Sequence, residues 1–237
     1  MNGLIPSITK NISTAASAAK NGADSILNPG AGIINNSGQI SQNPQAFGFA
    51  FEHLQAIGFN IKAGLKNSDI RAYQIPTDGN RFGADIKVVD SVGRVIAEIQ
   101  AKAGQSEYVQ DQVNSGHYQG DILTNIENNN LSGTTAYIEV EGIKSFSVNK
   151  DFAKWVAENP YMAADLIYAA ATRGEVGGAG IHGAAMNSTI NILLQTIKIV
   201  GSYCRGEDEL TRTELDHFLS VAIEGVKQVF IRGAAIK

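Results

Sequence analysis

Cysteine is nearly absent from this chain, since Cys204 is the only one among 237 residues. A single thiol cannot form an internal disulfide, and it cannot supply the several thiolates of a metal cluster. The fold must therefore be held together by packing and hydrogen bonds. A chain of this length is long enough to bury a sizeable core by these means.

Charge is also scarce, and neither sign dominates. Charged residues make up 18% of the chain, and 19 Lys and Arg against 23 Asp and Glu give a net charge of -4. Disorder driven by excess charge is excluded, because 43% of the residues are hydrophobic. A protein that coats nucleic acid through its overall positive charge is excluded as well, so any contact with nucleic acid must come from a local groove.

Long apolar runs are missing where targeting or membrane insertion would need them. Residues 1–20 carry no apolar segment of the length found in signal peptides. We therefore expect a cytoplasmic protein, with secretion by a signal-independent route left open. Residues 176–200 lack Asp and Glu, but Asn, Gln, Lys and His interrupt their apolar run. We expect a soluble helix of small residues there in place of a membrane span.

Composition divides the chain into three expected parts. Residues 1–43 are rich in Ser, Asn, Ala and Gly, which indicates a flexible or weakly helical N-terminal arm with one helix over about 8–26. Residues 44–148 mix the periodicities of helices and strands, as an α/β core would. Residues 149–237 predict an all-helical unit rich in Gly and Ala, with helices over 150–158, 160–173, 184–200 and 211–231.

The core is expected to open with a helix over 44–57. Apolar residues recur in it at intervals of three and four, which marks one face for burial: Phe47, Ala50, Phe51, Leu54 and Ile57. Glu52 lies beside this face. Gly58 is expected to end the helix, and the alternation within 59–63 predicts a first strand. The polar stretch over 66–82 contains turn-forming residues and predicts a loop.

Two further strands are predicted over 84–90 and 94–102, and the short turn between them makes them a hairpin. A helix over 105–115 and a strand over 134–141 follow. The expected fold is therefore α+β, with helices flanking a mixed sheet in the order α-β-β-β-α-β, followed by the helical C-terminal unit.

Polar residues gather around this hairpin. Glu98, Gln100 and Lys102 alternate along one strand and so share a face, and Asp85 on the other strand can reach the same edge. Mg²⁺ or Mn²⁺ binds oxygen ligands such as those of Asp85 and Gln100, beside phosphate and water. The ion activates water and neutralises phosphate charge, and an ammonium group such as that of Lys102 stabilises the transition state. The pattern therefore indicates metal-assisted cleavage of phosphodiester bonds.

The same residues resemble the PD-(D/E)XK nuclease superfamily, in the variant where Gln replaces the second acid, since Asp85 is followed by Gln100-Ala101-Lys102. Over about residues 44–141 the chain looks like the catalytic domain of Mrr-type restriction enzymes. The Gly48–Glu52 segment is similar to the Glu-bearing first helix of that family. The resemblance implies a restriction-endonuclease-like fold with these catalytic residues: Glu52, Asp85, Gln100 and Lys102. It also implies that Glu52, Asp85 and Gln100 approach the metal.

Some assignments around this set stay open. Glu98 is a competing acid, and if it replaces Gln100 as the ligand, Lys102 moves away from the metal. The resemblance also indicates that polar residues after the hairpin contact substrate: Gln105, Gln112 and His117. A plain alternative for Asp85 and Lys102 is a cross-strand ion pair on a solvated face.

We therefore expect a metal-dependent endonuclease that hydrolyses phosphodiester bonds in DNA, or in RNA, and acts in phage defence, in restriction or as a toxin or effector. Nucleic acid is the expected partner, and the C-terminal helices could join copies of the chain or bind another protein. Two alternatives stay open. One is a catalytically inactive module of the same fold that binds nucleic acid or protein, and the other is an effector whose Gly-rich helices contact a membrane.

Overall fold

The protein combines helices with small sheets, as the sequence predicts for an α+β fold. The computed structural model describes residues 4–76, 83–118, 121–125 and 131–178. Within these ranges the long helices are α1 (Leu4–Ile26), α2 (Ala46–Leu65) and α5 (Pro160–Gly178). The predicted helices over 184–200 and 211–231 lie outside the described residues.

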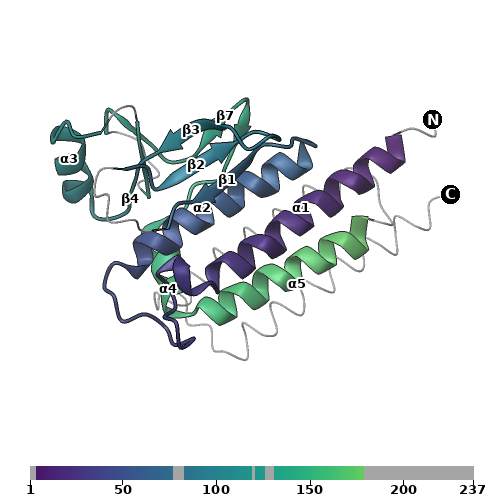
Figure 1. Ribbon diagram of the computed structural model, residues 1–237, viewed down its shortest axis with the longest axis horizontal. Helices are drawn as coiled ribbons and strands as arrows, with labels where there is room; N and C mark the ends of the chain where they lie inside the picture. Colours follow the sequence, from purple (N-terminus) through teal and green to yellow (C-terminus); the bar gives the residue numbers. More distant parts are fainter. Residues whose placement is uncertain (1–3, 77–82, 119–120, 126–130, 179–237) are drawn as a thin grey trace, which may run out of the picture.

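The elements are stacked in layers. The strands β1, β2 and β3 lie against one side of α2, α1 lies against its other side, and α5 packs on α1 (Figure 1). The shorter helix α4 (Lys150–Glu158) packs against α2. Its bounds are those predicted, and the Asn149 side chain caps it by accepting a hydrogen bond of 2.8 Å from the Phe152 backbone N–H.

The helix expected over about 8–26 of the N-terminal arm is present as α1, which begins earlier, at Leu4, and packs into the core. Small side chains of α1 face α2 and are buried, including Ala15, Ala19 and Ala23. These small side chains let the backbones of α1 and α2 approach closely. The approach is so close that a Cβ added at Gly64 of α2 would lie 2.7 Å from the Ala15 backbone nitrogen. The alanine-rich composition therefore reflects a helix-packing face, and this role can be recognised only when α2 is seen beside α1.

The predicted end of α2 at Gly58 and the strand over 59–63 are also wrong. The helix continues to Leu65, with Phe59 and Ile61 buried. Gly58 stands inside the helix because Phe146 packs directly on its backbone, and an added Cβ would lie 2.5 Å from Phe146 Cε1. Packing from both sides of α2 therefore overrides the local signals for a stop and a strand.

The first sheet is antiparallel and has the strand order β1-β2-β3. The predicted hairpin is present as β2 (Ile86–Val89) and β3 (Val95–Ile99). Its turn is held by Asp90, whose Oδ1 accepts hydrogen bonds from the backbone N–H groups of Val92 and Arg94. The loop expected over 66–82 is wrong in part, because β1 (Arg71–Gln74) lies within it and pairs with β2.

A second sheet continues from the hairpin. Ala101–Lys102 form β4, which pairs in parallel with β5 (Ile122–Thr124), and β5 pairs in parallel with β6 (Thr134–Thr135). The helix α3 (Ser106–Asn114) stands between β4 and β5 and confirms the helix predicted over 105–115.

Two corrections concern the strands that follow α3. The sequence did not predict β5, which is too short for a periodicity to be read. The single strand expected over 134–141 is divided into β6 and β7 (Glu139–Val140), and β7 forms a small hairpin with β8 (Ile143–Lys144).

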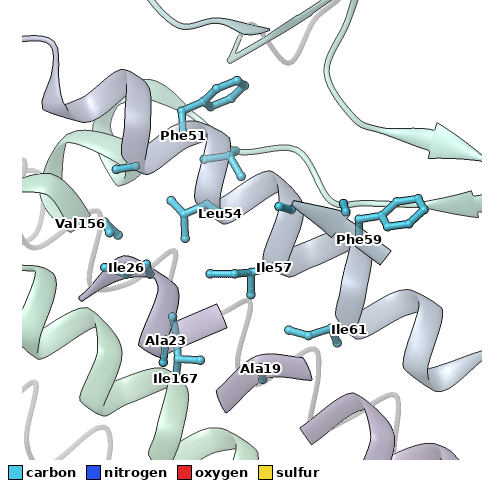
Figure 2. Packing of buried hydrophobic residues seen from close by; sticks show 14 of the residues in the cluster. Ala19, Ala23, Ile26, Phe51, Leu54, Ile57, Phe59, Ile61, Val156 and Ile167 are labelled. Carbon is cyan, nitrogen blue, oxygen red and sulfur yellow. The ribbon is translucent and has the colours of Figure 1, made fainter. Parts of the chain in front are cut away.

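One hydrophobic cluster draws on all three parts into which composition divided the chain. Ala23 and Ile26 come from α1, Leu54 and Ile57 from α2, and Ile167 from α5, and all of them are buried (Figure 2). The structure also contains the short 3-10 helix η1 (Pro29–Ala31) between α1 and α2. Among the described helices, none has the length and apolar character needed to cross a membrane.

Candidate active site

The site is built where the sheet changes from antiparallel to parallel pairing. The Asp85 backbone N–H donates to the Ile99 carbonyl (2.9 Å), which holds the start of β2 against the end of β3. The next residue, Gln100, stands between β3 and β4, and its carbonyl accepts from the Leu123 N–H of β5 (2.9 Å). Gln100 therefore stands where the antiparallel pairing ends and the parallel pairing begins, and Asp85 is placed directly beside it.

The Asp85 carboxylate is the centre of the cluster. Its Oδ2 accepts hydrogen bonds from the Ala101 backbone N–H at 2.7 Å and from the Gln100 side-chain amide. The Lys102 ammonium lies 3.4 Å from the same oxygen, and its side chain is largely shielded from solvent. The structure thus brings together three of the sequence-predicted residues around one oxygen atom.

Glu52 faces this cluster from α2. Its side chain is buried, with the residue 9% exposed, and its Oε2 accepts a hydrogen bond of 3.1 Å from the Gln74 amide on β1. Burial first, and then repulsion by the Asp85 carboxylate, raise the pKa of Glu52 to about 8. The Gln74 hydrogen bond and the Lys102 charge oppose this change in the pKa without cancelling it. Glu52 therefore carries a proton at neutral pH while no cation is bound.

A cavity of about 650 Å³ opens beside these groups. Its lining includes Glu52, Asp85 and Lys102, together with residues from the first turns of α2 and from α3. The cavity is of the size that holds small ligands in proteins. A molecule entering it would meet two carboxyl groups and an ammonium group on one wall.

The other predicted site residues are more scattered. Gln105 lines the cavity, whereas Glu98 is exposed, lies opposite Lys87 in the hairpin register and is not among the described residues that line the cavity. Gln112 accepts a hydrogen bond of 3.1 Å from the Tyr118 hydroxyl, and His117 is exposed beside the same tyrosine. The structure therefore separates Glu98 from the cluster and places Gln112 and His117 at its border.

Several neighbours of the cluster were not predicted from the sequence. Gln74 was assigned to a loop, and only its pairing in β1 shows that it reaches Glu52. Tyr118 lies under the Lys102 ammonium, with 5.2 Å from Nζ to the ring centroid, which is a cation–π geometry. Tyr108 and Lys150 line the cavity from α3 and α4. Their contacts depend on tertiary packing, so no sequence spacing could have indicated them.

The oxygen ligands of the cluster suit a hard cation. Asp85 Oδ1 and Glu52 Oε1 receive no hydrogen bond from any described residue, and both residues line the cavity. No group of three or more His, Cys, Asp or Glu side chains that could hold a metal occurs in the described part of the chain. Mg²⁺ does not require one, because it binds through one or two carboxylates and completes its shell with water and substrate phosphate.

Comparison with known proteins gives no further assignment. No protein-family model, no curated protein and no solved structure matches the chain. The chemistry of the site must therefore be argued from its own residues.

Proposed function

We propose that the protein is a metal-dependent nuclease of the PD-(D/E)XK type. The observation that carries the proposal is the convergence of Gln100, Lys102 and the Ala101 N–H on Asp85, with Glu52 facing them across a cavity. These residues come from a helix and two strands, yet they supply the oxygen ligands and the cation that hydrolysis of a phosphodiester requires.

In this mechanism Asp85 and Glu52 would hold a Mg²⁺ or Mn²⁺ ion, and the Gln100 amide oxygen would be a further ligand. The bound ion would supply an activated water molecule and positive charge for the phosphate. Lys102 is held between Asp85 and the ring of Tyr118, where its charge can stabilise the phosphate oxygens as the bond to the attacking water forms. Gln74 orients Glu52 by its hydrogen bond and so sets which carboxyl oxygen faces the cavity.

The arrangement of elements supports the restriction-endonuclease-like core. A helix (α2) is followed by three antiparallel strands (β1, β2 and β3), the short strand β4, a helix (α3) and a strand (β5) that pairs in parallel with β4. The proposed catalytic residues stand at the point where the antiparallel and parallel parts meet. DNA is the first substrate to test and RNA the second, and restriction, phage defence or an effector role would each use the same chemistry.

The test is cleavage of DNA and RNA in the presence of Mg²⁺ or Mn²⁺ by the wild type and by the variants Asp85→Asn and Lys102→Ala. Loss of a metal-bound water or of a fixed charge typically lowers the rate by a factor of about 10² or more. Glu98→Gln is the matched control, because it changes an exposed acid of the same hairpin that lies outside the cavity lining. Equal activity in the wild type, Asp85→Asn and Lys102→Ala would overturn the assignment, and loss of activity in Glu98→Gln would restore Glu98 as a ligand.

One observation favours a second candidate, a module of the same fold that binds nucleic acid or protein without cleaving it. Asp85 Oδ2 already accepts three hydrogen bonds, and Glu52 holds a proton, so the cluster is electrostatically balanced on its own. Calorimetric titration with Mg²⁺ separates the two candidates. Binding heat that disappears in Asp85→Asn supports the nuclease, and the same absence of heat in both proteins supports the non-cleaving module.

A further inference from the structure

Aromatic side chains line the cavity together with the charged cluster. Phe47, Phe49 and Phe51 from α2 and Tyr108 from α3 all contribute to the lining. Phe51 is buried, whereas Tyr108 is 46% exposed although it is a large aromatic side chain. The cavity therefore offers a partly solvated aromatic ring close to the groups that we propose to be catalytic.

The ring of Tyr108 is held in place by the backbone at Gly104. A Cβ added at Gly104 would lie 2.6 Å from Tyr108 Cδ1, so the ring packs directly on a residue that has no side chain. Gly104 is also tied down, because its N–H donates to the Asn125 side chain at 2.7 Å and its carbonyl accepts from the same side chain at 3.1 Å. Gly104 follows Lys102 by two residues, which fixes the exposed ring of Tyr108 beside the charged cluster.

Positive charge is sparse among the described residues that line the cavity. The described lining contains two cations, Lys102 and Lys150, and two acids, Glu52 and Asp85. Lys150 lies over another aromatic residue of the lining, with 5.5 Å from its Nζ to the centroid of the Phe47 ring. Proteins that follow a duplex backbone neutralise many phosphates with Lys and Arg, whereas proteins that bind single strands gain much of their affinity from stacking bases on aromatic rings.

We propose that the substrate of this site is an unpaired nucleic-acid strand, one nucleotide of which enters the cavity and stacks its base on Tyr108. The phosphodiester next to that base then lies at Asp85 and Lys102, and Lys150 binds a neighbouring phosphate. The cavity of about 650 Å³ has room for one nucleotide. A base within a duplex is already stacked and paired, so a duplex must fray or expose an end before one of its bases can stack on Tyr108. This inference rests on the proposed nuclease function and adds the substrate class to it.

The experiment compares cleavage of a single-stranded oligonucleotide with cleavage of the blunt duplex of the same sequence, in DNA and in RNA, with Mg²⁺ or Mn²⁺. Four proteins are used: the wild type, Tyr108→Ala, Tyr108→Phe and the control Tyr73→Ala. Tyr73 is an equally exposed tyrosine (50%), and it lies on β1 outside the described cavity lining. The single strand should be cleaved at least about 10-fold faster than the duplex. Stacking on one ring predicts a loss of about 5- to 150-fold in Tyr108→Ala on the single strand, recovery in Tyr108→Phe and no change in Tyr73→Ala.

A second measurement tests Lys150 by the salt dependence of binding. Single-stranded oligonucleotide is titrated with Ca²⁺ present to prevent turnover, and the logarithm of the binding constant is plotted against the logarithm of salt concentration. Lys150→Ala should reduce the slope by about 0.7, the value for one phosphate contact on a single strand. An unchanged slope would overturn the proposed contact between Lys150 and a phosphate.

The outcomes separate this inference from the proposed function. Cleavage that depends on Asp85 and Lys102 but is equal or faster on the duplex overturns the inference and leaves the nuclease in place. The same holds if Tyr108→Ala cleaves the single strand as fast as the wild type does. If no protein cleaves any substrate and the wild type binds none of them, the proposed function and the inference both fail. Preference for single-stranded DNA or for single-stranded RNA supports the inference and shows whether the substrate contains deoxyribose or ribose.

Discussion

Replacing Glu52 with glutamine removes a carboxyl group that the fold holds in its protonated form. The pKa of Glu52 is about 8 in the folded chain against 4.5 for an ordinary glutamate, mainly because the side chain is buried and then because Asp85 repels its charge. Between these two values the folded chain binds one proton more than the unfolded chain. The free energy of unfolding of the wild type therefore falls as the pH rises from 4.5 to about 8, and the contribution is fully present only below 4.5.

The size of the effect follows from the same two values. One pH unit corresponds to about 1.4 kcal/mol, so the interval from 4.5 to about 8 corresponds to about 5 kcal/mol. Glu52→Gln has no group to ionise at this position, so its free energy of unfolding does not fall with pH for this reason. His53 acts in the opposite direction, because burial lowers its pKa from 6.5 to about 4, and stability from this group falls as the pH drops through that interval. Since His53 is present in both proteins, its contribution cancels in their difference.

The assay is urea denaturation of the wild type and Glu52→Gln at half-unit steps from pH 4 to pH 9. Relative to the wild type, Glu52→Gln should become more stable with rising pH, by an amount on the order of 5 kcal/mol across the range. A difference between the two proteins that is independent of pH would refute the reasoning. Repeating the series with Mg²⁺ adds a second criterion: the ion binds ionised Glu52, so it should stabilise the wild type more at pH 8 than at pH 6, and Glu52→Gln much less at both.

Two further predictions concern stability. Gly64→Ala should lower the free energy of unfolding by roughly 1–3 kcal/mol, because its Cβ would lie 2.7 Å from the Ala15 backbone nitrogen and would push α1 from α2. The matched change Gly48→Ala in the same helix has open space around the new Cβ and should raise stability by up to about 1 kcal/mol. Thr124→Val should raise it by about 1 kcal/mol, because the buried Thr124 Oγ1 has no hydrogen-bond partner among the described residues. Thermal or urea denaturation measures all three, and destabilisation by Thr124→Val would show that this hydroxyl has a partner.

The sequence predicted the parts of the fold whose signals are local. The hairpin of β2 and β3 has its turn chemistry in Asp90 and Gly93, and the helix α4 has its cap in Asn149. These signals lie within a few residues of the element they define, so they hold in any surroundings. The juxtaposition of Asp85 with Gln100 and Lys102 has the same origin, because strand alternation and a short turn largely determine which residues of a hairpin can meet.

The sequence failed where elements depend on distant partners. Residues 59–63 alternate as a strand does, but Phe146 packing on Gly58 and Ala15 packing on Gly64 keep them in α2. The polar residues of β1 become a strand only because β2 pairs with them, and this pairing is what brings Gln74 to Glu52. A short polar segment has no periodicity of its own that would reveal either relation.

The residues of the proposed site are thus set by the chain itself, in the order and spacing of Asp85, Gln100 and Lys102 at the open end of the hairpin. Their chemical state comes from the assembled fold. Burial under α2 protonates Glu52, the ring of Tyr118 lies under the Lys102 ammonium, and the backbone at Gly104 holds Tyr108 at the cavity. Charge, solvation and shape at a site arise from groups that meet only when distant segments pack together, and no local pattern can encode them.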